Sequence, residues 1–343
     1  MENDYLIRQK PFRALLVFAL PMILGNLFQQ TYTLMDSAIV GRYVGEQALA
    51  AVGASYALTN IFICIAIGGG IGASVAVSRY FGSKEFPRMK LAVYTACLAF
   101  LGVSILLGGF GLALSRQIME VLQTPADVLD MAVDYLNIYF AGLPFLFLYN
   151  VFSSMFNALG KSRIPLYFLI FSSVFNVVLD IVLVTKANMG VTGVAWATLI
   201  AQGISAVFSL LIFFCRMRRY KSIFAWFEGQ ELRSMLRIAV PSVLQQSTVS
   251  IGMMIVQAVV NPFGTQALAG YAATMRVENV FSLIFVSIGN AVSPFVSQNL
   301  GANKTQRIKK GYHAALVLDV CFAALAFLVI ETLHTQISSL FLG

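Results

Sequence analysis

Nine apolar stretches, each about twenty residues or longer, dominate this sequence. They cover roughly residues 12–40, 46–78, 91–114, 131–158, 164–184, 191–215, 235–261, 267–298 and 311–340. A helix needs about 20 apolar residues to cross a bilayer, whereas the strands of a membrane barrel are about half as long and alternate in polarity. With 59% hydrophobic and 11% charged residues, the chain has more apolar surface than a soluble fold can bury. The sequence therefore predicts an all-α membrane protein with about nine transmembrane helices.

The basic residues alternate between the two sides of these stretches. With the N-terminus placed inside, 19 of the 23 basic residues fall at inside loops, and the outside loops hold only Arg42, Arg116 and Lys186. Basic loops face the cytoplasm by the positive-inside rule, so a cytoplasmic N-terminus and a multi-pass topology are expected. The net charge of +8 is spread over short loops, which argues for the lipid bilayer as partner and against nucleic acid.

The chain repeats itself at an offset of 219 residues. GEQALAAVGASYALTNIF, from Gly45, aligns with GTQALAGYAATMRVENVF, from Gly264, and VSRYFGSKE, from Val77, aligns with VSQNLGANK, from Val296. A period that covers six spans predicts two parallel six-helix repeats, related by an axis along the membrane normal.

The offset also predicts the domain organisation. We expect an N-terminal six-helix bundle over residues 1–215, a cytoplasmic linker over 216–234 and a C-terminal bundle over 235–343. Two complete repeats would need twice 219 residues, and the chain has 343. The second bundle is therefore expected to be incomplete, with three helices, and the chain to be a truncated form of a longer protein.

Two of the apolar stretches carry the carboxylates Asp36 and Asp180. Asn176 and Asp180 are four residues apart in one stretch and share a helix face, and Asp36 lies in another. An ionised carboxylate near the bilayer centre costs about 2.5–3.5 kcal/mol on insertion scales, so such residues usually mark a functional site. Oxygen groups suit hard cations, and two carboxyls that share a site can also carry a proton and titrate as a pair. The alternative is a polar cluster that only holds helices together.

Other polar residues are candidates for a substrate cavity. Arg276 and Glu278 are two residues apart, so on a straight helix they do not face each other, and they are either structural charges or part of the cavity mouth. Polar and aromatic side chains recur on the first and fourth stretches and could contact amphipathic cations. For each of them, packing between helices is the alternative. The full candidate set is Asn26, Gln29, Gln30, Tyr32, Tyr135, Tyr139, Asn150, Arg276 and Glu278.

Several motifs together resemble the multidrug and toxic compound extrusion (MATE) family. They are the opening LPMILGNLFQQTYTLMDSAIVGRYVGEQALAAVG, then VSRYFGSKE, FNALGKSRIPL and FNVVLDIVLV, and in the second half TMRVEN and VSQNLGANK. This family belongs to the multidrug/oligosaccharidyl-lipid/polysaccharide flippase superfamily. The resemblance implies twelve helices in two bundles around a central cavity, and export driven by inward Na⁺ or H⁺ across the bacterial cytoplasmic (inner) membrane.

The resemblance also implies a coupling-ion site. Members similar to the bacterial DinF-like branch hold Na⁺ or a proton inside the N-terminal bundle, and the matching residues here are Asp36, Asn176, Asp180 and Thr198. Other branches use acidic residues on the seventh and eighth helices. Here the seventh stretch has none and the eighth has Glu278, which favours coupling in the N-terminal half.

The sequence thus favours a secondary active antiporter that exports cationic or amphipathic drugs in exchange for H⁺ or Na⁺. Neither an organic cofactor nor a metal other than Na⁺ is expected, and we expect a monomer. A lipid-linked oligosaccharide flippase of the same superfamily would need a basic cavity, and the spans carry almost no basic residues besides Arg276. A membrane-embedded enzyme would need a nucleophile–base pair or a metal motif, and neither HExxH nor GxSxG occurs.

Overall fold

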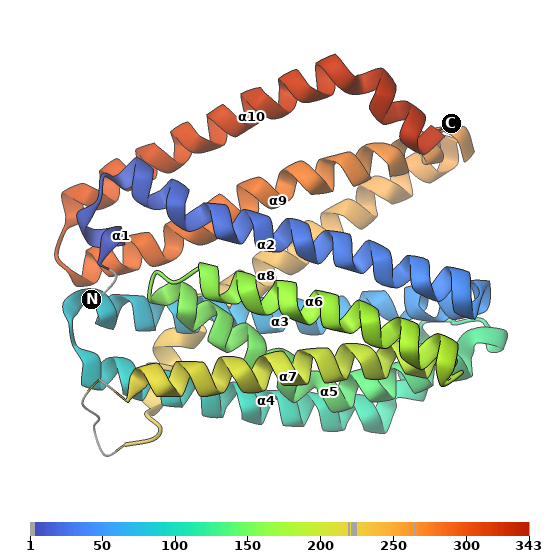
Figure 1. Ribbon diagram of the computed structural model, residues 1–343, viewed down its shortest axis with the longest axis horizontal. Coiled ribbons are helices and arrows are strands. Elements are labelled where there is room, and N and C mark those ends of the chain that lie inside the picture. The colour runs from blue at the N-terminus through green and yellow to red at the C-terminus, as the bar shows by residue number, and fades with distance from the viewer. Residues whose placement is uncertain (1–3, 219, 221–224, 264, 343) are drawn as a thin grey trace.

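The computed structural model describes residues 4–218, 220, 225–263 and 265–342. In this part of the chain nearly every residue is helical and no strand occurs, which confirms the all-α class (Figure 1). The long helices are α2 (Pro11–Ile39), α3 (Glu46–Ser83), α4 (Phe86–Val121), α5 (Ala126–Ala158), α6 (Arg163–Ile181), α7 (Gly190–Met217), α8 (Gly229–Val260), α9 (Thr265–Gly301) and α10 (Thr305–Leu342). The short ones are α1 (Tyr5–Arg8), the π-helical turns η1 (Val40–Val44) and η2 (Val182–Lys186), and the 3-10 turn η3 (Asn261–Phe263).

Each predicted apolar stretch corresponds to one long helix of the described chain. Eight helical segments of the part that the structure describes are long and apolar enough to cross a membrane. The remaining predicted stretch, 235–261, forms α8, and some of its side chains lie outside the described residues. The helices extend past the predicted limits at several ends, because polar residues can continue a helix into the water on either side of a bilayer.

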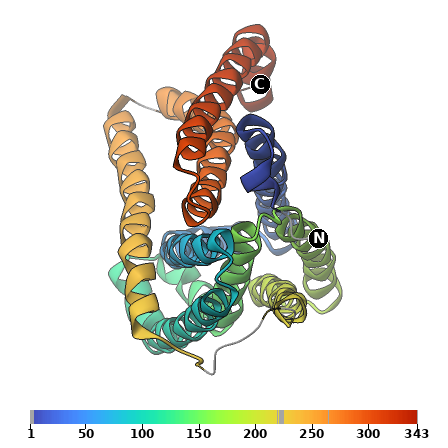
Figure 2. The same ribbon diagram turned by 90° about the vertical axis from the view of Figure 1, so that its left-hand side faces the viewer.

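The long helices run side by side along the molecule (Figure 1). α3 packs against α4 and α5 and also against α8 and α9, whereas α2 packs against α6 on one side and against α9 and α10 on another. Figure 2 shows α8 along one flank, apart from α9 and α10. Helices of the first predicted bundle therefore contact helices of the second. Between them, the predicted linker at 216–234 includes the end of α7 and the first residues of α8, which begins at Gly229.

The parallel repeat is visible in the geometry of its equivalent residues. Lys84 ends α3 in the left-handed region with a φ of 61°, and Asn303, 219 positions later, follows α9 with a φ of 57°. The backbone N–H of the next residue bonds back five residues in both cases, from Glu85 to Tyr80 over 3.0 Å and from Lys304 to Asn299 over 2.8 Å. The two repeats therefore end their second helix in the same way.

Several loops and α1 gather at one end of the molecule, which we call the basic end. It comprises residues 4–10, 83–86, 158–163 and 301–305 together with the described part of 217–229. Here α3 and α9 cross at equivalent glycines. A Cβ at Gly82 would overlap the carbonyl oxygen of Gln298, and a Cβ at Gly301 would overlap that of Arg79. Because Arg79 and Gln298 are themselves equivalent, the crossing is reciprocal and closely packed.

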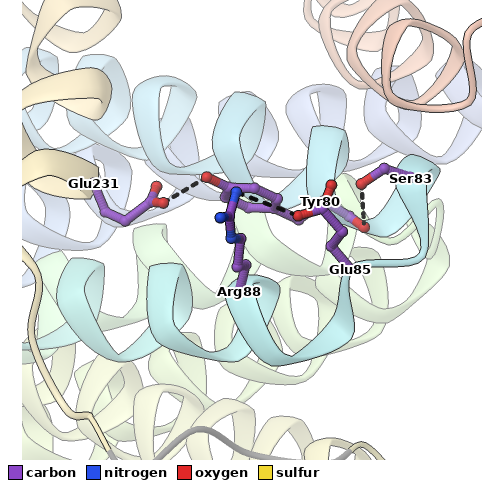
Figure 3. Close-up of polar contacts among 5 residues, drawn as sticks. All are labelled: Tyr80, Ser83, Glu85, Arg88 and Glu231. Carbon is purple, nitrogen blue, oxygen red and sulfur yellow. Dashed lines mark hydrogen bonds and ion pairs between the residues drawn. The ribbon is translucent and has the colours of Figure 1, made fainter.

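A hydrogen bond between the two repeats adds to this contact at the basic end. The Tyr80 hydroxyl, on α3, donates to Oε1 of Glu231, on α8, over 2.5 Å (Figure 3). Arg88, at the start of α4, forms an ion pair of 3.5 Å with Glu85 beside it. The basic end of α3 is thus joined to α8 by side chains and to α9 by backbone packing.

Candidate functional site

Four polar side chains from three helices lie together towards the end of the molecule opposite the basic end. Asp36 lies near the end of α2, Asn176 and Asp180 lie one turn apart on α6, and Thr198 lies on α7. Asp180 is fully buried, Asn176 is 1% exposed, and the other two are half-buried. α6 packs against both α2 and α7, which brings side chains that are distant in the sequence into one cluster.

Asn176 links α6 to α7 within this cluster. With its amide nitrogen turned towards Asp180, it donates to Oδ2 over 2.9 Å, and its oxygen accepts from the backbone N–H of Thr198 over 3.1 Å. In the opposite orientation the nitrogen donates to the Thr198 hydroxyl over 3.3 Å. The first orientation pairs each donor with an acceptor, because an ionised carboxylate only accepts. In either orientation Asn176 contacts α7.

The carboxyl groups of Asp36 and Asp180 lie within hydrogen-bonding distance of each other. A hydrogen bond between two carboxyls requires a proton on one of them, because an ionised carboxylate has no donor. In addition, Oδ1 of each residue is buried and has no hydrogen-bond partner among the described residues. This pair can therefore be satisfied by a shared proton or by a cation that contacts both carboxylates.

The chemistry of the cluster fits a hard monovalent cation or a proton. Its polar groups supply carboxylate, amide and hydroxyl oxygens, which are the ligands that hard cations prefer. Among the described residues, no group of three or more His, Cys, Asp and Glu side chains is arranged to hold a metal ion. Asp36, Asn176, Asp180 and Thr198 are the residues that would hold Na⁺ or the proton.

Two tyrosines expected in the substrate cavity lie against this cluster. The Tyr32 side chain lies close to both Thr198 and Asp36. Tyr135, on α5, lies close to both Asp36 and Asp180. The spacing of Tyr32 and Asp36, four residues apart on one helix, is a signal that could have placed Tyr32 here. The sequence around Tyr135 holds no comparable signal, since its position depends on how α5 packs.

Both helices that carry the carboxylates continue as π-helical turns immediately beyond them. η1 follows α2 and η2 follows α6, and the two turns contact each other. Buried valines of these turns, Val40 and Val184, pack with Val191 and Val194 of α7 into one apolar cluster, which Tyr135 also contacts. π-helical turns are rare and often occur at functional sites. This apolar cluster lies about one helical turn beyond each carboxylate.

The other candidate cavity residues have separate partners. Asn26 donates to the Ser287 hydroxyl on α9 over 2.9 Å. The Tyr139 hydroxyl donates to the Thr59 carbonyl on α3 over 3.3 Å. Asn150 donates over 2.9 Å to the carbonyl of Leu146 on its own helix. Of the rest, Gln29 and Glu278 are exposed, Gln30 is half-buried, and the side chain of Arg276 lies outside the described residues.

A mainly apolar pocket of about 630 Å³ lies elsewhere, between α3, α4 and α8. Its lining includes Ile65, Phe100, Leu236 and Val243, and it contains none of the residues expected in the cavity. Polar side chains in the sequence do not indicate this pocket, because most of its lining residues are apolar. In the sequence these residues look like those of any other membrane helix.

The fold defines a polytopic helical membrane protein with a cluster of oxygen groups buried inside it. The MatE family model matches residues 21–182 and 241–343, and the chain belongs to this family. MATE proteins are transporters, so the chain is a transporter and not an enzyme.

Relatives and solved structures agree with this family. The chain is 30% identical over 348 residues to the Probable multidrug resistance protein YoeA of Bacillus subtilis (strain 168), covering 98% of this chain and 75% of the relative. It is 25% identical to Multidrug export protein MepA of Staphylococcus haemolyticus (strain JCSC1435), covering 94% and 72%. A MATE family transporter solved in an outward-facing conformation has a TM-score of 0.92 at 21% identity, covering 99% of this chain and 76% of that one. The chain thus spans about three-quarters of each of these proteins.

Proposed function

We propose that this MATE family multidrug efflux transporter is an antiporter that exports amphipathic, often cationic compounds in exchange for H⁺ or Na⁺. The observation that carries the proposal is the contact between the Asp36 and Asp180 carboxyls, with Asn176 and Thr198 beside them. A structural polar cluster could be built from neutral groups at lower cost, since each carboxylate must be desolvated. A pair of carboxylates suits a site that alternately takes up and releases positive charge.

The proposed mechanism begins with repulsion between two ionised carboxylates. A proton or Na⁺ that enters the site removes this repulsion and holds Asp36 of α2 against Asp180 of α6. α2 also packs against α9 and α10, so its position affects contacts with the second repeat. Pro21 within α2 removes one backbone hydrogen bond and allows the helix to bend there. Export is coupled to ion entry if ion and substrate favour different positions of α2.

The proposed orientation places the basic end in the cytoplasm of a bacterial cell, because basic loops face the cytoplasm. The carboxylate cluster then lies in the half of the bilayer that an incoming ion reaches first. For the substrate, the names of two relatives point to drugs, whereas a 25% identical protein of Shewanella oneidensis is named FAD transporter. A transport assay should therefore include an anionic compound such as a flavin nucleotide as well as cationic drugs.

The proposal is tested by transport of a fluorescent cation and of a flavin nucleotide in proteoliposomes, under separate Na⁺ and pH gradients. We expect export of the cation with at least one gradient, and loss of that export in Asp36→Asn and Asp180→Asn. Asp127→Asn, an exposed carboxylate at the start of α5, makes the same change of charge and should leave export intact. Export by Asp36→Asn and Asp180→Asn equal to that of the unmodified protein would refute the coupling assignment.

A further inference from the structure

The basic end carries a pocket that has no part in the proposed transport cycle. It measures about 550 Å³ and lies between the junction of α1 with α2 and the start of α10. The lining residues include five with cationic side chains, Arg8, Lys10, Lys304, Arg307 and Lys310, and none with an acidic one. Asp4 forms an ion pair of 3.3 Å with Arg8, but it does not line the pocket. The pocket is therefore strongly positive.

Two of the pocket cations, Lys304 and Arg307, are held in place by neutral groups. Lys304 Nζ donates to the carbonyl of Ile7 over 3.2 Å, and Arg307 donates to the carbonyls of Leu6, over 3.2 Å, and Gln9. Carbonyl oxygens carry no net charge, so these bonds orient the side chains and leave their charge available. The Nε of Arg307 is buried and has no hydrogen-bond partner among the described residues. The first turn of α10 lines the same pocket, and the amides at a helix N-terminus favour anions.

The position of the pocket relative to the membrane indicates the source of the anion. Two candidate spans begin at its edge, one at Pro11 and one at Thr305. Beyond the pocket these helices carry exposed apolar side chains, including Phe12, which is 44% exposed, and Tyr312, which is 57% exposed. The pocket thus lies where two spans leave the apolar layer. This is the depth of phospholipid headgroups, and basic pockets between membrane helices at this depth suit anionic ones.

We propose that this pocket binds the phosphate group of an anionic phospholipid. The headgroup contacts α1 and α2 of the first repeat and α10 of the second at the same time. A bound lipid therefore strengthens the packing of the two repeats at the basic end. Its acyl chains lie along the exposed apolar surfaces of α2 and α10.

The test measures thermal unfolding of the purified protein in detergent with added phosphatidylglycerol, phosphatidylcholine or inorganic phosphate. We expect phosphatidylglycerol to raise the Tm more than phosphatidylcholine does. The double variant Lys10→Gln/Lys310→Gln should weaken binding of phosphatidylglycerol roughly 30-fold, since each basic side chain near an anionic surface contributes a factor of about five. Arg13→Gln/Lys309→Gln removes the same charge from exposed neighbours outside the pocket and should retain the effect.

Each outcome decides the proposal. A Tm increase with phosphatidylglycerol that is lost only in the Lys10/Lys310 variant supports it. If inorganic phosphate alone gives the same increase with the same dependence on the variants, the pocket is a phosphate site but the lipid source is wrong. If no anion raises the Tm, or if both double variants lose the effect equally, the pocket is overturned as a binding site.

Discussion

At the scale of single residues, polar neighbours stabilise the two carboxyl groups that lie together inside the helical bundle. Asp180 accepts a hydrogen bond from Asn176 one turn below it and contacts Asp36 on the neighbouring helix. Tyr32 of α2 and Tyr135 of α5 lie close to the same groups, so four helices contribute to one cluster. Burial strengthens these polar contacts, and removing one partner leaves a buried polar group unpaired, which costs free energy.

Part of this cluster could be predicted from the sequence. Asp36, Asn176 and Asp180 stand out because charged and amide groups are costly within apolar stretches. Thr198 is a small hydroxyl residue in an apolar helix, and only the resemblance to the family indicated it. For Tyr32 the sequence holds one signal, its spacing of four residues from Asp36. For Tyr135 it holds none, since the contact of Tyr135 with the cluster depends on how α5 packs.

The position of Tyr32 leads to a prediction that separates a role at the ion site from one in the substrate cavity. Tyr32→Phe removes a hydroxyl that lies close to Thr198 and Asp36. It should raise the cation concentration needed for half-maximal transport by a factor of about five, the effect of losing one polar contact of about 1 kcal/mol. The substrate concentration for half-maximal transport should stay unchanged. The matched control is Tyr139→Phe, whose hydroxyl bonds the Thr59 carbonyl, and it should leave the cation dependence unaltered. If only the substrate concentration for half-maximal transport changes, Tyr32 contacts the substrate and not the ion site.

At the scale of helices, the crossing of α3 with α9 is set by glycine. Gly82 and Gly301 each face a backbone carbonyl of the other helix, so an added methyl group meets an atom that cannot rotate away. Overpacking of this kind costs about 1–3 kcal/mol or forces the helices apart. Ser78 and Gln298 both donate to the carbonyl of Ala158, at the end of α5, and fix the same crossing from the side.

We predict that Gly82→Ala and Gly301→Ala open the basic end. The measurement is maleimide labelling of Ser297→Cys, a position that is 6% exposed, in a background that lacks the four native cysteines. Labelling should be faster in both glycine variants than in the parent protein. Gly53→Ala in α3 and Gly289→Ala in α9 are matched controls, because a Cβ at either position has no atom within 4 Å. Equal labelling rates in all four variants would contradict a role for the crossing.

For the molecule as a whole, the sequence predicted the long helices of the described residues but not how the halves meet. The apolar stretches define the described helices, and the offset of 219 residues predicts their repeat, because both depend on local composition. The packing of α3 on α8 and α9, the contact of α2 with α10 and the two π-helical turns depend on tertiary contacts. Neither the bond from Tyr80 to Glu231 nor the basic pocket was predicted, since each unites residues more than 100 positions apart.

The bond from Tyr80 to Glu231 provides a test of how strongly the two repeats are joined at the basic end. A hydrogen bond to a charged group contributes about 1.5–3 kcal/mol when it is shielded from water, and less at half-buried positions such as these. We therefore expect Tyr80→Phe and Glu231→Gln each to lower the Tm. The double variant should lower it by less than the sum, with a coupling of about 1 kcal/mol. Glu85→Gln removes the exposed ion pair with Arg88, seen beside Tyr80 in Figure 3, and should leave the Tm nearly unchanged. Strictly additive effects of Tyr80→Phe and Glu231→Gln would mean that the two side chains stabilise their own helices separately, and that packing of α3 with α8 and α9 alone joins the repeats.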